Sequence, residues 1–359
     1  MPQTVNQQPT SRTKLKQLNF RTIWQILRQT FDEWSEDKAS RLAAALAYYT
    51  VFSIAPLLVI VIAIAGLIFG EEAARGEIVT QIQGLVGRSG AEVIETAIQN
   101  ANQPATGSIA SIISIVALLF GAIGVFTQLQ DALNTIWEVQ PKPGRPVKGF
   151  IRRNVLSFTM VLGIGFLLLV SLVISAVLAG ISTYFSHLVP GFDVLWQIIN
   201  FLVAFAVTTL LFAMIFKFLP NVHITWGDVW IGAIITSLLF SIGRFLLGLY
   251  LGNGSFGSTY GAAGSLIIIL AWVYYAAQIL FFGAEFTQVY ARRFGSQIVP
   301  DEHAVSMTRN DRIQQGIPYK EDVNAASESA EKNRAYRRRS RKIGLPGFIR
   351  RLSDKRKGR

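Results

Sequence analysis

Residues 264–290, GSLIIILAWVYYAAQILFFGAEFTQVY, decide the class of this protein. The stretch is long and apolar, and Glu285 is its one charged side chain. About 20 apolar residues in a helix cross the roughly 30 Å hydrocarbon core of a bilayer. Lipid offers backbone amides no hydrogen-bond partner, so a segment that crosses it alone must be helical. These residues therefore predict a transmembrane helix.

Five further stretches of the same kind precede it, near residues 43–70, 109–131, 154–182, 196–219 and 228–250. The chain has 359 residues, of which 51% are hydrophobic and 16% are charged. A soluble protein with six buried helices would need far more polar sequence to cover them. We therefore expect an all-α, polytopic membrane protein with six transmembrane helices.

The distribution of Lys and Arg predicts the orientation, because positive residues are held on the cytoplasmic side of a membrane. Seven precede the first span, five lie between the second and third spans, and 18 follow the sixth. The first external connection carries two, and the third and fifth connections carry none. Both ends of the sequence are therefore expected in the cytoplasm, in a multi-pass protein of the inner (plasma) membrane.

Three regions follow from this reading: an N-terminal cytoplasmic segment over 1–42, a transmembrane domain over 43–290 and a basic tail over 291–359. The first contains an amphipathic stretch from Phe20 to Trp34, which either lies in the membrane interface or packs on the inner end of the bundle. The tail is polar enough to be disordered. Its position beside the membrane predicts attraction to anionic lipids, and we expect no specific nucleic acid partner.

Polar side chains at membrane depth are costly and usually face the interior of a bundle, so function is sought among them. In the first span, three residues follow one helical face: Tyr49, Ser53 and Pro56. Pro56 removes a backbone hydrogen bond near mid-span, which gives either a contact site at a broken helix or an ordinary kink. In the second span, three residues recur at helical spacing near the cytoplasmic end: Gln128, Asp131 and Asn134.

The fifth and sixth spans carry the strongest polar signals. The fifth places three residues on one face: Ser237, Ser241 and Arg244. Arg244 either binds an anionic group or reaches the external headgroups. The sixth places three more on one face: Tyr275, Gln278 and Glu285. Glu285 is expected to meet Arg41 or Asn134 in the cytoplasmic layer, as a structural clasp or as part of a proton or ion relay. All twelve residues are hypothetical substrate or ion contacts.

The sequence offers no catalytic centre. It has no cysteine, and its three histidines, His187, His223 and His303, are far apart without metal-ligand spacing. The glycine-rich connection over 252–265 has no phosphate-binding loop sequence. We therefore expect no enzyme activity, no metal site and no cofactor.

Four stretches together resemble the YihY/BrkB family of bacterial inner-membrane proteins, historically labelled ribonuclease BN. They are RLAAALAYYTVFSIAPLL (41–58), LQDALNTIWEV (129–139), LPNVHITWGDVWIGA (219–233) and YGAAGSLIIILAWVYYAAQILFFGAEF (260–286). The resemblance covers roughly residues 20–295 and implies a six-helix plasma-membrane protein with an envelope-related role. It implies no settled substrate, and the residues give the ribonuclease label no support.

Three functions compete at this point. The first is a transporter or a lipid or solute translocator, with polar faces of the spans lining an interior cavity and Arg244 attracting an anionic group. The second is a non-transporting scaffold that organises envelope partners. The third is a membrane-bound ribonuclease whose basic tail holds RNA electrostatically. The sequence defines neither the coupling ion nor the oligomeric state.

Overall fold

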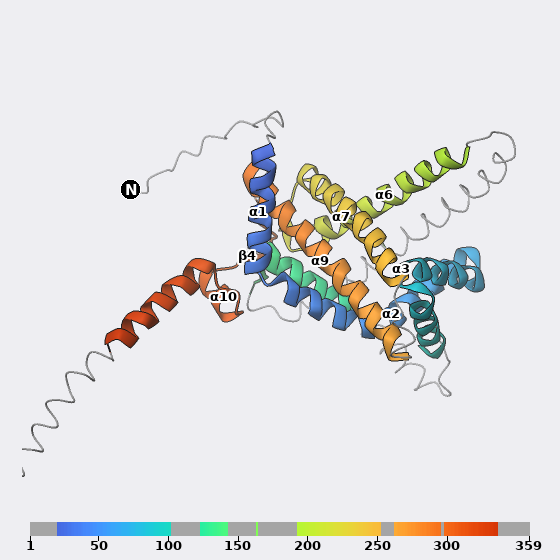
Figure 1. Cartoon of the computed structure of the whole chain (residues 1–359), viewed down its shortest axis with the longest axis horizontal. Coiled ribbons are helices and arrows are strands. Elements are labelled where there is room, and N and C mark those ends of the chain that lie inside the picture. The colour runs from blue at the N-terminus through green and yellow to red at the C-terminus, as the bar shows by residue number, and fades with distance from the viewer. Residues whose placement is uncertain are drawn as a thin grey trace, which may run out of the picture. The chain divides into compact units, whose positions relative to one another are not determined.

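The computed structural model describes residues 20–101, 123–142, 163, 192–252, 262–295 and 298–336 (Figure 1). Several predicted features lie outside these residues. They are the third span near 154–182 apart from Gly163, the outer part of the second span, residues 253–261 and the last part of the tail, 337–359.

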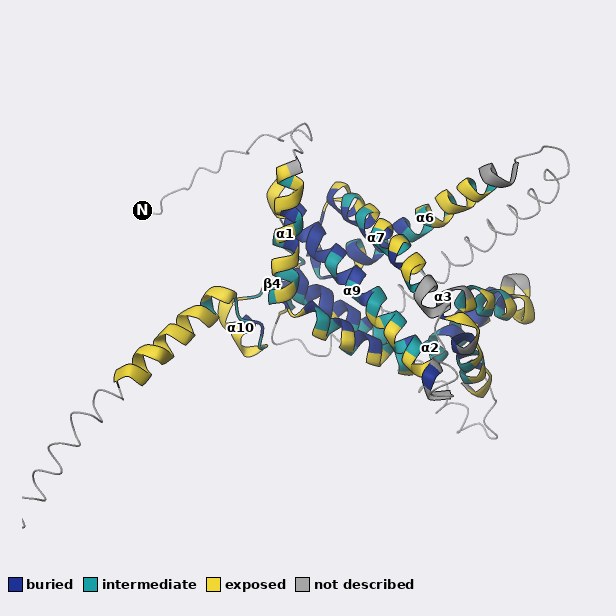
Figure 2. Ribbon diagram, viewed as in Figure 1, coloured by how far each residue is buried: buried dark blue, intermediate teal, exposed yellow. Residues whose placement is uncertain are grey.

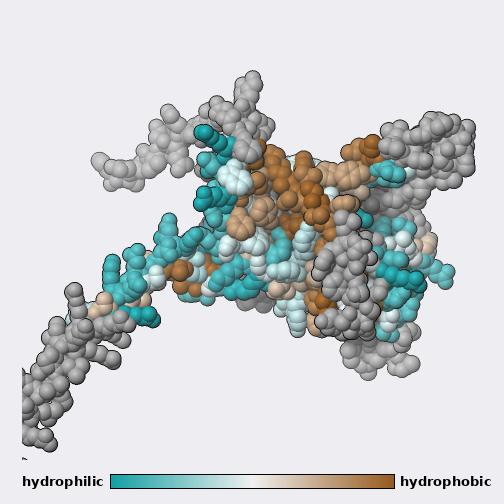
Figure 3. Space-filling model, viewed as in Figure 1, coloured by the Kyte–Doolittle hydropathy of each residue, from teal (hydrophilic) through white to brown (hydrophobic). Residues whose placement is uncertain are grey.

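Four long apolar helices form the body of the described protein: α2 (Ala39–Phe69), α6 (Phe192–Phe218), α7 (Trp226–Gly252) and α9 (Ala262–Phe294). Each contains a stretch long and apolar enough to cross a membrane, and each coincides with one of the predicted spans. Apolar side chains gather on the surface over α7 and α6 in Figure 3, as expected of helices that face lipid. The chain is therefore a mainly helical, multi-pass membrane protein.

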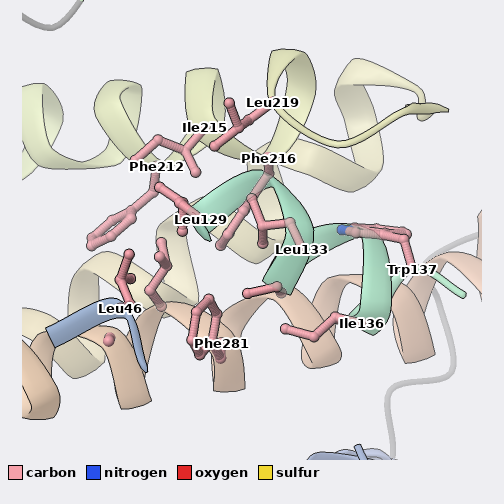
Figure 4. Packing of buried hydrophobic residues seen from close by; sticks show 14 of the residues in the cluster. Leu46, Leu129, Leu133, Ile136, Trp137, Phe212, Ile215, Phe216, Leu219 and Phe281 are labelled. Atoms are coloured by element: carbon pink, nitrogen blue, oxygen red, sulfur yellow. The ribbon is translucent and has the colours of Figure 1, made fainter. Parts of the chain in front are cut away.

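The C-terminal half of α9 is the centre of the fold. Almost every residue over 279–291 is buried, as the dark blue C-terminal half of α9 in Figure 2 shows. A helix that is buried on all sides must be surrounded by others, and α9 packs against α1, α2, α3 and α7. Phe281 of α9 meets Leu133 and Phe216 in the largest apolar cluster, which also involves a helix over residues 123–136, the inner end of the second predicted span (Figure 4).

Helices α7 and α9 approach closely because glycine and threonine interlock. Thr236 of α7 lies over Gly283 of α9, where an added Cβ would be 2.9 Å from the Thr236 Cβ. Thr287 of α9 lies in the same way over Gly232 of α7, with 2.8 Å between the corresponding atoms. Each threonine hydroxyl donates to the carbonyl of the glycine four residues earlier in its own helix, at 2.7 and 2.6 Å. Small residues and satisfied hydroxyls are what close packing within lipid requires.

The amphipathic segment before the first span forms α1 (Phe20–Glu36). Its buried Ile26 packs with Phe286 and Val289 of α9. Its other face stays open, with Trp24 63% and Phe31 57% exposed. The helix therefore packs on α9 through one face and leaves an aromatic face exposed.

The connection after the first span forms α3 (Glu71–Ala101), two helical pieces that meet at Gly87. Gly87 has φ 77° and ψ 174°, a region that glycine alone enters without strain. Ile94 and Ile98 are buried against Leu58 and Ile62 of α2. The connection is a helical hairpin that caps the end of the bundle opposite α1.

Two short antiparallel sheets join connections between the helices to the residues after α9. β1 (Val139–Pro141) pairs with β4 (Ala304–Ser306), and β2 (Val222–His223) pairs with β3 (Val299–Pro300). Residues after α9 thus bond to the connections after the second and fourth predicted spans. The first compact unit of the chain ends at Ser306.

A second unit begins at Met307. Its short helix α10 (Arg309–Gln314) starts with a capping box in which Thr308 and Asp311 bond to each other's backbone N–H. A longer helix covers 320–336, so this part of the tail, which was expected to be disordered, has described secondary structure. The hydrogen bond that Arg309 donates to Asp322 raises the pKa of its guanidinium and joins the two helices.

Candidate functional site

The polar residues of the first two spans meet where α2 packs against the helix over 123–136. An added Cβ on Gly124 would lie 3.6 Å from the Ser53 hydroxyl and 3.8 Å from the Tyr49 ring. Ser53 is buried, Pro56 is half-buried, and 44% of Tyr49 is exposed. Helix α2 continues through Pro56, so the proline does not end the span.

Near the inner end of this helix, polar side chains fasten the connection that follows α6. The Asn134 carboxamide oxygen accepts from the Asn221 N–H at 2.8 Å. The Gln130 amide, which the sequence did not single out, donates to the Leu219 carbonyl at 2.9 Å. Asn134 therefore has a structural bond, whereas Gln128 is half-buried and Asp131 exposed on the same helix.

One face of α7 changes from buried to exposed as the helix rises toward its outer end. Ser237 is 0% exposed, Ser241 is half-buried and donates to the Ser237 carbonyl at 2.8 Å, and Arg244 is exposed. Within the described residues, the Ser237 hydroxyl has no hydrogen-bond partner. The Tyr275 hydroxyl of α9 lies against Gly243, next to Arg244 in the chain. The structure thus brings the polar faces of α7 and α9 together at this level.

Glu285 is the most unusual group in the bundle. It is 0% exposed, and neither carboxylate oxygen has a hydrogen-bond partner in the described part of the chain. The expected bond to Arg41 or Asn134 is not formed, because Arg41 is exposed and Asn134 holds Asn221. Two turns earlier on the same face, the Gln278 carbonyl oxygen is also buried without a described partner.

Charged residues from three segments surround the C-terminal end of α9. Glu285 interacts electrostatically with Asp37, Glu33, Glu138 and Arg292. Arg292 donates to Glu138 at 2.7 Å and lies 3.7 Å from Glu33. Asp37, at the junction of α1 and α2, is only 4% exposed. The arrangement is acidic, with the one arginine already engaged by two carboxylates.

Sequence reasoning missed Gln288, which lies one turn beyond Glu285. Its amide donates to the Ile136 carbonyl at 2.5 Å, while its own carbonyl oxygen is buried without a described partner. A signal was present, because Gln288 follows Glu285 at helical spacing in an apolar helix. Asp37 gave no such signal, since it lies outside the predicted spans.

The described residues contain no group of three or more His, Cys, Asp or Glu side chains that could hold a metal ion. The His223 Nε2 atom lies 2.7 Å from an Asp301 carboxylate oxygen, where it joins β2 to the residue after β3. His187 lies outside the described residues. The geometry thus gives the ribonuclease interpretation no support.

Residues 30–308 match the model of the family described as virulence factor BrkB. Relatives include UPF0761 membrane proteins of three bacteria. That of a Psychrobacter species is 27% identical over 84% of this chain and 56% of its own length. That of Ralstonia nicotianae is 25% identical over 75% of this chain and 59% of its own length. That of Pseudomonas aeruginosa is 28% identical over 69% of this chain and 58% of its own length.

The chain spans less than two thirds of the length of these three relatives. No solved structure matches it. The family model covers well over half of the chain, and the relatives are named as membrane proteins, in agreement with the apolar helices described above. The chain therefore belongs to the virulence factor BrkB family of multi-pass inner-membrane proteins.

Proposed function

We propose that this protein is a transporter that moves an anionic lipid or solute across the plasma membrane through the interior of a six-helix bundle. Both termini of the bundle face the cytoplasm in this proposal, in accordance with the distribution of Lys and Arg. The basic tail binds the surface of the inner leaflet, because its Lys and Arg residues are attracted to anionic lipids.

The observation that carries the proposal is the set of buried polar atoms without described partners inside an apolar bundle. They belong to Ser237, Gln278 and Glu285. Each unsatisfied buried polar group costs about 1–3 kcal/mol, and a charged group costs more. A protein that only needed a stable scaffold would gain by replacing these residues with apolar ones. Polar groups retained at this cost are typical of a substrate or ion pathway.

The exposed end of the α7 polar face suggests the charge of the substrate. Arg244 forms no hydrogen bond or ion pair with the described residues, and it follows Ser237 and Ser241 on one face. A guanidinium can grip a carboxylate or phosphate through two parallel hydrogen bonds. Arg244 is thus the group that would attract an anionic substrate at the outer mouth of the bundle.

Reconstitution into liposomes tests the proposal. Flux of a fluorescent anionic phospholipid and of small anionic solutes is measured for the wild type and for Arg244→Lys and Arg244→Gln. Both variants should lose flux, the Gln variant more, because Lys keeps the charge but loses the planar fork. Arg88→Gln on α3 removes an equal charge from a side chain that is 83% exposed and serves as the control.

Two outcomes contradict the proposal in different ways. A fully active Lys variant would remove Arg244 from the substrate site. A folded wild-type protein that moves none of the lipids or solutes would contradict translocation and favour the non-transporting scaffold instead.

A further inference from the structure

Four carboxylates and one guanidinium interact around the inner end of α9. Glu285 contributes from α9, Glu33 and Asp37 from α1 and its junction with α2, and Glu138 from the turn after the helix over 123–136. Arg292, two turns after Glu285, is the single described cation that acts on this carboxylate. These five side chains therefore have a net negative charge when all four carboxylates are ionised.

Glu285 forms neither a hydrogen bond nor an ion pair in the described part of the chain, and Arg292 is the one described cation that favours its ionised form. Both of its oxygens are buried and lack a hydrogen-bond partner in the described part of the chain. The Arg292 guanidinium instead forms an ion pair with Glu138 at 2.7 Å and lies 3.7 Å from a Glu33 carboxylate oxygen. An isolated ionised carboxylate at this position would be strongly unfavourable. The site is therefore built for a positively charged occupant.

A proton fits this site better than a metal ion. A metal ion needs several ligands at short distances, and the described residues bring together no group of three or more that could hold one. A proton needs one carboxylate oxygen and no cavity, and it turns that oxygen into a donor. Gln288, one turn away on the same helix, offers a buried carbonyl oxygen without a described partner.

We propose that Glu285 is a proton-binding site near the cytoplasmic end of the bundle. The carboxylate takes up one proton to become a carboxylic acid and releases it unchanged as a proton. Asp37, Glu33 and Glu138 repel the ionised form, and Arg292 favours it. This inference names the proton as the coupling ion of the proposed transporter. Proton binding at Glu285 does not depend on the proposed function, and only the movement of the proton across the membrane rests on it.

Infrared difference spectroscopy of the full-length protein in lipid, recorded during a pH titration, measures proton binding directly. A carboxylic acid that is buried and weakly hydrogen-bonded gives a carbonyl stretch at a higher frequency than solvated acids. The wild type should show such a band, and Glu285→Gln should lose it. Glu72→Gln, which changes an exposed carboxylate on α3, should keep it.

Asp37→Asn provides a second test that keeps Glu285 in place. It removes one repelling charge, so the pH at which the band disappears should shift relative to the wild type. A band that persists in Glu285→Gln would overturn the proton site. If Glu285→Gln does not fold, an unshifted band in Asp37→Asn would overturn it instead.

Proton flux into the same liposomes, followed with a trapped pH-sensitive dye, separates this inference from the proposed function. A Glu285-dependent band without any flux of protons or substrate would leave the proton site standing and contradict transport. Substrate flux driven by a pH gradient and unaffected in Glu285→Gln would leave transport standing and overturn the role of Glu285.

Discussion

Substitution of Gly283 by alanine tests whether the interlocked glycines and threonines hold α7 against α9. The new Cβ would lie 2.9 Å from both the Cβ and the Cγ2 of Thr236 and would overlap its hydroxyl oxygen. Ordinary contacts begin at 3.4 Å, and the hydroxyl oxygen would lie well inside that distance from the new Cβ, so either the gap to this oxygen widens by about 1.5 Å or Thr236 rotates. Rotation breaks its 2.7 Å hydrogen bond to the Gly232 carbonyl.

Overpacking of this kind costs about 1–3 kcal/mol in the free energy of unfolding. Thr236→Ala removes the hydroxyl and Cγ2 from the contact, so the double variant Gly283→Ala/Thr236→Ala should recover part of the loss. The expected coupling between the two sites is about 1–2 kcal/mol, within the range measured for residues in contact. Gly227→Ala is the matched control, because it lies in α7 and an added Cβ there meets nothing within 4 Å.

Unfolding by SDS in mixed micelles, followed by the fluorescence of the seven tryptophans, measures these free energies. Gly283→Ala should unfold at a lower SDS fraction than the wild type, whereas the control should not. If Gly283→Ala were as stable as the control, or the double variant no more stable than Gly283→Ala, the close approach of the two helices would not be the origin of their stability.

Three further predictions concern other parts of the fold. Gly87→Ala should destabilise the α3 hairpin by about 1–3 kcal/mol, because the φ of 77° at Gly87 disfavours any side chain. Hydrogen exchange in α3 should be faster in this variant than in the wild type, whereas the control Gly76→Ala should leave it unchanged. Truncation after Ser306 should leave the melting temperature of the bundle unchanged, whereas removal of β3 and β4 as well should lower it. A cysteine that replaces Glu72 should react with an impermeant thiol reagent only from outside the cell, and one that replaces Glu302 only from inside. The reverse pattern would contradict the proposed topology.

Hydropathy predicted the described spans well because the bilayer imposes one rule on every crossing segment. The first span was expected near 43–70 and forms α2 over Ala39–Phe69, and the sixth was expected near 264–290 and forms α9 over Ala262–Phe294. The helices extend beyond the apolar stretches because backbone hydrogen bonds continue into the polar layer. Hydropathy reports only where the chain is apolar and not where its helices end.

The candidate site was harder to predict because its contacts join distant parts of the chain. The sequence identified Glu285 as a costly residue, but not that its carboxylate would lack a described partner. The bonds of Gln130 and Gln288 link residues 89 and 152 positions apart. Helical periodicity reveals which residues share a face and contains no information on which neighbour that face meets. The two short sheets escaped prediction for a similar reason, since strands of two or three residues show no alternation.

The pairing of β1 with β4 has a consequence for how the protein is made. Val139 pairs with Ser306, so the connection after the second predicted span waits for its partner until nearly all of the membrane domain has been synthesised. Contacts between residues so far apart in the chain form late and slowly. Strand β1 therefore stays unpaired in a nascent chain until α9 and the residues after it have been synthesised. A ribosome that stalls before β4 has been made would leave a chain whose connection after the second predicted span remains open to proteolysis.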